Sequence, residues 1–123
     1  MTRIAIPAAL IAPSFRATAQ DAALVDAKHC KVLVDNAHVR VLEFDLPPGA
    51  KDPVHTHAAG VYVVTRAGKM KVTPVGKKPE VWEPKANEAA WMEAEGPHGS
   101  ENVGSTPFSF VLVEVKGAAG SSR

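Results

Sequence analysis

The sequence predicts a single all-β domain, folded as an antiparallel sandwich or barrel. Its 123 residues suffice for one hydrophobic core and leave little for a second. Ten prolines and nine glycines favour many turns, which suits short strands better than long helices. β-branched and aromatic runs recur between these turns, and no amphipathic helical pattern follows residue 30. We therefore expect short strands that bury one core.

The first two strands are expected at 31–34 and 39–46. In the second run, even positions share one face because side chains alternate along a strand; these are Arg40, Leu42, Phe44 and Leu46. The turn sequence Pro47-Pro48-Gly49 ends this strand. Arg40 thus lies on an otherwise apolar face, where a buried cation requires a carboxylate. We expect an internal salt bridge, for example to Glu93, rather than a substrate acid.

The later strands are also predicted as short runs separated by turns. They are expected at 61–65, 69–75, 81–82, 89–92 and 108–115. Lysine and threonine alternate with apolar residues in 69–75, which indicates a half-exposed strand. Turn residues at 67–68, 87–88 and 104–107 separate the runs.

Composition excludes several classes of protein. Fourteen Lys and Arg against thirteen Asp and Glu give a net charge of +1, without the clustered basic face of a nucleic-acid binder. No apolar run reaches the about 18–20 residues that a membrane span requires. Cys30 is the only cysteine, so the chain has neither an internal disulfide nor a cysteine-based zinc cluster.

The first nineteen residues are predicted to be a secretory signal peptide. Met1-Thr2-Arg3 gives a basic start, residues 4–12 are apolar, and Ala17-Thr18-Ala19 offers the small-x-small pattern cut before Gln20. The protein would then be periplasmic or secreted. The alternative is a flexible or packed amino-terminal arm on a cytoplasmic protein.

The remaining chain divides into three predicted parts. Residues 20–30 form an amino-terminal extension, 31–116 the barrel domain, and 117–123 a small, polar, flexible tail.

Three histidines are candidate metal ligands. His55 and His57 are two residues apart, so on a strand both rings would face the same way. His98 would open a further strand. Imidazole nitrogens about 2.1 Å from one ion are common in metal sites. If the two strands meet inside a barrel, the three rings would form a facial ligand set with open positions.

At these residues the chain resembles the cupin superfamily of small β-barrels. The first cupin motif is Gly, five residues, His-x-His, three or four residues, Glu, six residues, Gly. The residues that fit its spacing are Gly49, His55, His57 and Gly68. In the second motif, Gly, five residues, Pro-x-Gly, two residues, His, three residues, Asn, the fitting residues are His98 and Asn102. The resemblance covers roughly residues 30–116 and implies a small antiparallel β-barrel, or jelly roll.

The departures from the motifs fall on four positions, and in the second motif Asn87 stands for the first glycine and Glu93 for the proline. Val61 stands where the family has its glutamate ligand, with Tyr62 next to it, and Glu95 stands for the second glycine of the second motif. The resemblance then implies a metal on three neutral imidazoles, as in ferrous three-histidine dioxygenases; zinc, manganese and nickel are the other candidates. Such a metal keeps its +2 charge, which favours a small anionic substrate.

Other residues are expected to surround this centre. Candidate pocket residues are Arg40, Val61, Tyr62, Met70 and Trp91. Strict alternation from His57 would point Val61 inward and Tyr62 outward. His29 and His38 are expected on the surface or as caps.

Three functions remain open on the sequence. The first is a ferrous dioxygenase acting on a small anionic molecule. The second is a non-redox, metal-dependent lyase or isomerase, and the third is a barrel that binds a ligand or metal without turnover. A homodimer paired through sheet edges is plausible, because an open edge strand is a liability.

Overall fold

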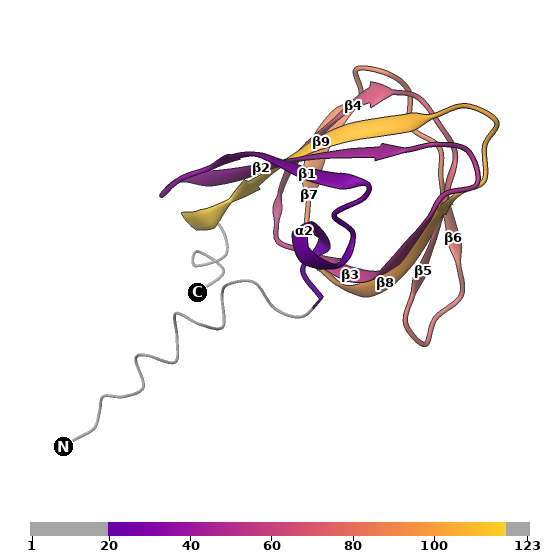
Figure 1. Cartoon of the computed structure of the whole chain (residues 1–123), viewed down its shortest axis with the longest axis horizontal. Coiled ribbons are helices and arrows are strands. Elements are labelled where there is room, and N and C mark those ends of the chain that lie inside the picture. Colours follow the sequence, from indigo (N-terminus) through magenta and orange to yellow (C-terminus); the bar gives the residue numbers. More distant parts are fainter. Residues whose placement is uncertain (1–19, 118–123) are drawn as a thin grey trace.

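The computed structural model describes residues 20–117, which form two antiparallel sheets closed into a small barrel (Figure 1). Five strands lie in the order β1-β2-β9-β4-β7 and four in the order β3-β8-β5-β6. Their bounds are β1 (Cys30–Asp35), β2 (Val39–Leu46), β3 (Lys51–His57), β4 (Gly60–Arg66), β5 (Met70–Pro74), β6 (Glu80–Trp82), β7 (Ala89–Met92), β8 (Glu95–Asn102) and β9 (Phe108–Val115). The expected all-β antiparallel class is confirmed.

Sequence periodicity locates several strands to the residue. β2, β7 and β9 have the expected bounds, and β3 and β8 carry the histidines, as the pattern required. The extension before β1 contains a single helical turn, α2 (Ala22–Val25), and Asp21 makes an isolated parallel bridge with Thr56. The predicted signal peptide lies outside the described residues, as does the tail beyond residue 117. No helix in residues 20–117 has the length and apolar character to cross a bilayer.

The core lies against the inner face of the five-stranded sheet. β2 and β9 pair along their full length, from Val39 opposite Val115 to Leu46 opposite Phe108. The Phe44 and Phe110 rings stack with centroids 4.6 Å apart. The other fully buried apolar side chains around them are Leu42, Leu46, Val64, Phe108 and Leu112. Burying such a side chain contributes about 1.5–3 kcal/mol, so this cluster holds the barrel closed.

Gly60 marks the point where the chain passes from one sheet to the other. It begins β4, and a Cβ atom there would overlap the backbone carbonyl of Val113 on β9. Because β3 and β4 belong to different sheets, alternation does not continue from His57 into β4. Val61 is 37% exposed and Tyr62 is half-buried toward the core, which corrects the orientation expected for this pair.

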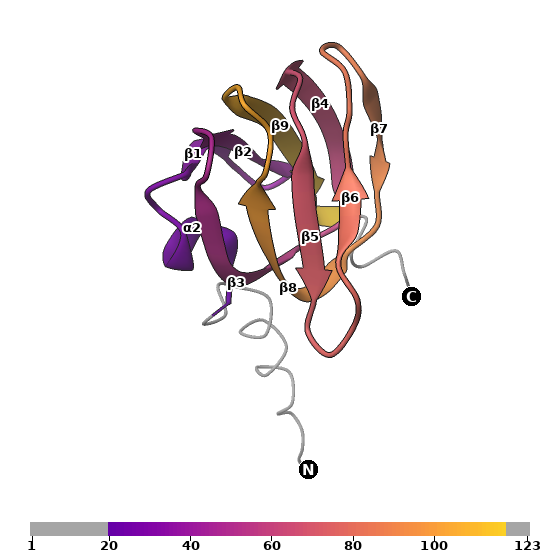
Figure 2. The ribbon, with the colours of Figure 1, turned by 90° about the vertical axis from the view of Figure 1, so that its right-hand side faces the viewer.

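The four-stranded sheet forms the opposite wall. Figure 2 shows β3, β8, β5 and β6 side by side, with the five-stranded sheet behind them. β8 lies between β3 and β5, paired with both. The two histidine-bearing strands are therefore neighbours and present side chains to one interior.

Candidate metal centre

Three imidazole rings from β3 and β8 converge inside the barrel. Ring centroids lie 4.9 Å apart for His55 and His57, 4.5 Å for His55 and His98, and 5.0 Å for His57 and His98. One possible ligand atom from each ring lies within 4.8 Å of those of the other two, and all three residues are buried. The predicted convergence is present, and the arrangement suits a single metal ion.

The strand register places these rings opposite one another. His55 pairs with His98, and the register then shifts so that His57 pairs with Glu95. A second shift lies on the other side of His55, where Asp52 pairs with Ser100. Each shift is a β-bulge, in which one strand has an extra residue. The bulge in β3 falls at Pro53 and Val54, and that in β8 at Gly96 and Pro97.

The bulges also orient two of the rings. The Nδ1 atom of His55 donates to the carbonyl oxygen of Pro53 at 2.7 Å, and Nδ1 of His98 donates to that of Gly96 at 2.8 Å. A proton held on Nδ1 leaves the lone pair on Nε2, which is the tautomer a metal ligand needs. The backbone therefore prepares both imidazoles for an ion.

His57 is held differently. Its ring meets Phe44 edge-on with centroids 5.4 Å apart, and its buried Nδ1 has no hydrogen-bond partner among the described residues. Burial lowers the pKa of His57 well below its usual value, and the neighbouring histidines lower it further. Burial likewise lowers the pKa of His55. Both imidazoles are therefore neutral near pH 7, as metal coordination requires.

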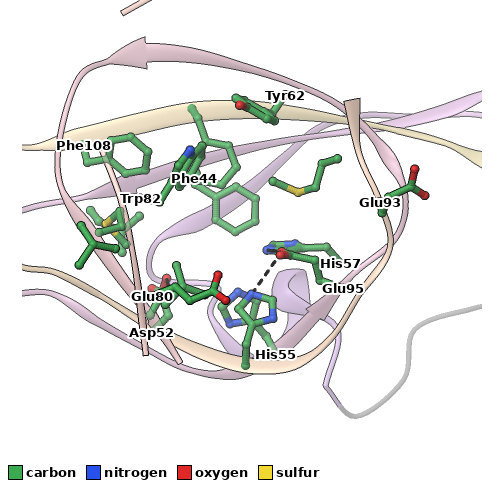
Figure 3. Close-up of a pocket in the computed structure, with 18 of the residues that line it drawn as sticks. Phe44, Asp52, His55, His57, Tyr62, Glu80, Trp82, Glu93, Glu95 and Phe108 are labelled. Carbon is green, nitrogen blue, oxygen red and sulfur yellow. Dashed lines mark hydrogen bonds and ion pairs between the residues drawn. The ribbon is translucent and has the colours of Figure 1, made fainter. Parts of the chain in front are cut away.

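The rings border a cavity of about 410 Å³ (Figure 3). Aromatic and apolar side chains form much of its wall; they include Phe44, Met70, Trp82, Phe108 and Phe110. The carboxylates in its lining are Asp52, Glu80, Glu93 and Glu95, and no described lining residue is Lys or Arg. The protein side chains thus supply only negative charge to this space.

The predicted pocket residues divide into two groups. Tyr62, Met70 and Trp91 line the cavity, whereas Val61 and Arg40 do not. Val61 faces outward because the sheet change at Gly60 resets the alternation of β4.

Arg40 makes an internal salt bridge, but not with Glu93. Its guanidinium bonds both carboxylate oxygens of Asp21, at 2.9 and 2.7 Å, and Glu114 Oε1 at 2.7 Å. Glu93 accepts instead from the indole nitrogen of Trp91 at 3.0 Å. Asp21 lies in the amino-terminal extension, so nothing in the β-strand pattern pointed to it.

Glu95 is a functional candidate that sequence reasoning placed in a motif but gave no role. Its Oε1 lies 3.7 Å from Nε2 of His98 and 4.0 Å from Nε2 of His57. Figure 3 shows Glu95 beside His57. Glu95 and His98 are three residues apart and would face opposite sides of a regular strand, so only the bulge between them, which the sequence does not mark, brings them together.

A polar network adjoins the centre behind β3. His29 Nδ1 lies 3.0 Å from Asp26 Oδ1 and 3.2 Å from Asp52 Oδ1, while Ser100 donates to Asp52 Oδ2 at 2.7 Å. Burial, a hydrogen bond to Asp52 and the charge of Asp52 raise the pKa of Asp26 to about 8. His29 is therefore part of an interior network rather than the surface residue or cap expected from its place in the sequence.

Comparisons with known proteins bear on this geometry. Residues 42–114 match the family described as Cupin domain. A search of curated proteins found no match. Similar solved structures include a cupin domain from Bordetella pertussis Tohama I, which is 24% identical with a TM-score of 0.64 over 70% of this chain and 90% of that one.

Two further structures share the fold. A conserved protein with a double-stranded β-helix domain from Klebsiella pneumoniae is 26% identical, with a TM-score of 0.56 over 74% of this chain and 78% of that one. An RmlC-like cupin family protein from Methanocaldococcus jannaschii is 21% identical, with a TM-score of 0.57 over 70% and 77% of the two chains.

Proposed function

We propose a function from the premise that this chain belongs to the cupin domain family: it is a small cupin that binds one divalent metal ion through His55, His57 and His98. The observation that carries the proposal is the convergence of three buried imidazoles, with possible ligand atoms within 4.8 Å of one another. Two of these rings already have Nδ1 bonded to a backbone carbonyl, which leaves Nε2 for the ion.

The residues present fit a borderline metal. Imidazole is a good ligand for iron, zinc and nickel, and an adjacent carboxylate extends the range to manganese. When bound, such an ion would supply a Lewis acid or, if ferrous, a centre for oxygen activation. We propose Fe(II) first, with the protein acting as a dioxygenase on a small molecule that binds the metal through an anionic group.

The side chains of the cavity wall would exclude water from the metal and restrict the charge of the substrate. Phe44, Met70 and Phe110 are buried apolar residues that exclude water from the three rings. Because the lining carboxylates would repel a second anionic group, the metal would attract the single anionic end of the substrate. The rest of that molecule would be neutral or cationic.

The runner-up function is a non-redox lyase or isomerase that uses zinc or manganese. It is favoured by Asp52, which lines the cavity and accepts a hydrogen bond from Ser100. A carboxylate in such a place could move a proton to or from a bound substrate. In the dioxygenase, the same carboxylate would have only a structural role.

Elemental analysis of protein purified without added metal tests the proposal. We expect near-stoichiometric metal in the wild type and in His38→Ala, a matched control at an exposed position, and almost none in His55→Ala or His98→Ala. Iron with oxygen consumption would favour the dioxygenase, and zinc or manganese with oxygen-independent turnover the runner-up. Equal metal content in all four proteins would contradict the site.

A further inference from the structure

We propose that Glu95 is the fourth ligand of this centre, a carboxylate that takes over from the glutamate absent at Val61. The inference rests on the proposed function, since it assumes an ion bound by the three histidines. It assigns a metal-binding role to a residue that occupies a glycine position of the second cupin motif.

The bulge in β8 brings Glu95 to the inner face of the barrel. In a regular strand, residues three apart face opposite sides, so Glu95 and His98 would not share a cavity. The pairing of His55 with His98 and of His57 with Glu95 shows that β8 has one residue more than β3 across this step. Gly96 and Pro97 are exposed, whereas Glu95 and His98 both line the cavity.

The distances are close to those of a ligand set. Ligand atoms about 2.1 Å from a common ion lie about 3.0 Å apart at an octahedral angle and about 3.4 Å apart at a tetrahedral one. The Oε1 atom of Glu95 is 3.7 Å and 4.0 Å from the Nε2 atoms of His98 and His57. These separations would have to shorten by about 0.3–1 Å, which a rotation of the flexible Glu95 side chain can supply.

Glu95 is also available for this role, unlike its neighbours. Asp52 uses one oxygen for His29 and the other for Ser100. Glu93 accepts from Trp91, and its carboxylate points away from the histidines (Figure 3). Among the described residues, the Glu95 carboxylate makes ion-pair contacts with the two imidazoles and no other.

A fourth, charged ligand would change the electrostatics of the site. Three neutral imidazoles leave a divalent ion at +2, whereas Glu95 would reduce the charge of the complex to +1. The Glu95 side chain is 42% exposed, so it lies at the open side of the centre. An anionic group entering from solvent would meet this carboxylate and compete with it for the ion.

The test is a Co²⁺ titration of chelator-treated full-length protein, followed by calorimetry and by the visible absorption spectrum of the bound ion. The proteins are the wild type, Glu95→Gln and the matched control Glu93→Gln, which removes one charge from the same rim. We expect Glu95→Gln to bind Co²⁺ about 10- to 100-fold more weakly, with an altered spectrum, and Glu93→Gln to match the wild type.

The outcomes separate the two proposals. Wild-type affinity and spectrum in Glu95→Gln would overturn the role of Glu95 while leaving the three-histidine site intact. An equal loss in both variants would overturn it too, because a general effect of rim charge would explain the result. No Co²⁺ binding by the wild type would reject the metal site itself. Circular dichroism of each metal-free variant establishes that it is folded.

Discussion

Two short segments, 52–55 on β3 and 95–98 on β8, share a bulged backbone but differ in the role of their acidic residue. Each begins with an acidic residue, passes through a bulge that contains proline, and ends with a metal-ligand candidate. In each, the histidine Nδ1 donates to a carbonyl two residues earlier in the chain. The two segments thus prepare His55 and His98 in the same way.

The acidic residues of the two segments differ in what surrounds them. The Asp52 side chain is 3% exposed and both of its oxygens accept hydrogen bonds, while that of Glu95 is 42% exposed and, among the described residues, contacts the imidazoles of His57 and His98. Strand register thus decides which carboxylates reach the cavity. Their neighbours decide whether a carboxylate stabilises the fold or is free to bind an ion.

Replacing each acid by alanine should separate the two roles most clearly. Asp52→Ala leaves the Ser100 hydroxyl without its acceptor and removes one of the two carboxylates that contact His29, at a cost of about 1–3 kcal/mol for a group left unsatisfied. We expect a loss of about 3 kcal/mol in the free energy of unfolding, measured by urea denaturation of metal-free protein. Glu95→Ala should change it by less than about 0.5 kcal/mol. Similar losses for the two variants would remove the distinction.

The pH dependence of stability sharpens the comparison on the β3 side. The pKa of Asp26 is raised from 3.8 to about 8, so between these values the folded protein retains a proton that the unfolded chain releases. Ionisation then favours the unfolded chain, and the Asp26 contribution to stability decreases as pH rises from about 4 to 8.

Asp26→Asn, whose side chain stays neutral, provides the reference. We expect the unfolding free energy of the wild type to fall relative to this variant across that range and to level off above it. Urea midpoints of both proteins at pH 4 to 9 would measure this. If the wild type instead keeps or gains stability relative to Asp26→Asn as the pH rises, Asp26 is ionised in the folded protein.

A smaller loss of stability than that of Asp52→Ala is expected when the hydroxyl that donates to Asp52 is removed. Ser100→Ala removes one hydrogen bond to Oδ2 and should lower the free energy of unfolding by about 1 kcal/mol. Ser105→Ala, at an exposed loop position, is the matched control and should be neutral. If Ser100→Ala is also neutral, the network around Asp52 is weaker than its geometry indicates.

Sequence periodicity predicted the fold well because buried residues alternate with less buried ones over 41–46 in β2 and 110–115 in β9. The histidine pair on β3 could also be predicted, since residues two apart share a strand face. Local alternation, however, extends only as far as a regular strand. The alternation does not continue through the change of sheet at Gly60. Val61 is therefore exposed and Tyr62 half-buried, the reverse of the expected orientations.

The parts of the site that the sequence did not predict depend on irregular backbone and on contacts between residues far apart in the chain. A bulge leaves little trace in a sequence, so nothing indicated that Glu95 and His98 would share a face. The partners of Arg40 come from opposite ends of the chain, Asp21 and Glu114. His29 and Asp52 likewise come into contact only after the amino-terminal extension packs against β3.

The tight contact at Gly60 also bears on attempts to remodel the binding chamber. Any side chain there would force β4 away from Val113, and the shift would pass directly to Tyr62 two residues later. Mutant libraries aimed at new ligands should therefore hold position 60 constant. Tyr62 and Trp82, whose rings meet at 5.3 Å along the cavity wall, are the better places to introduce diversity.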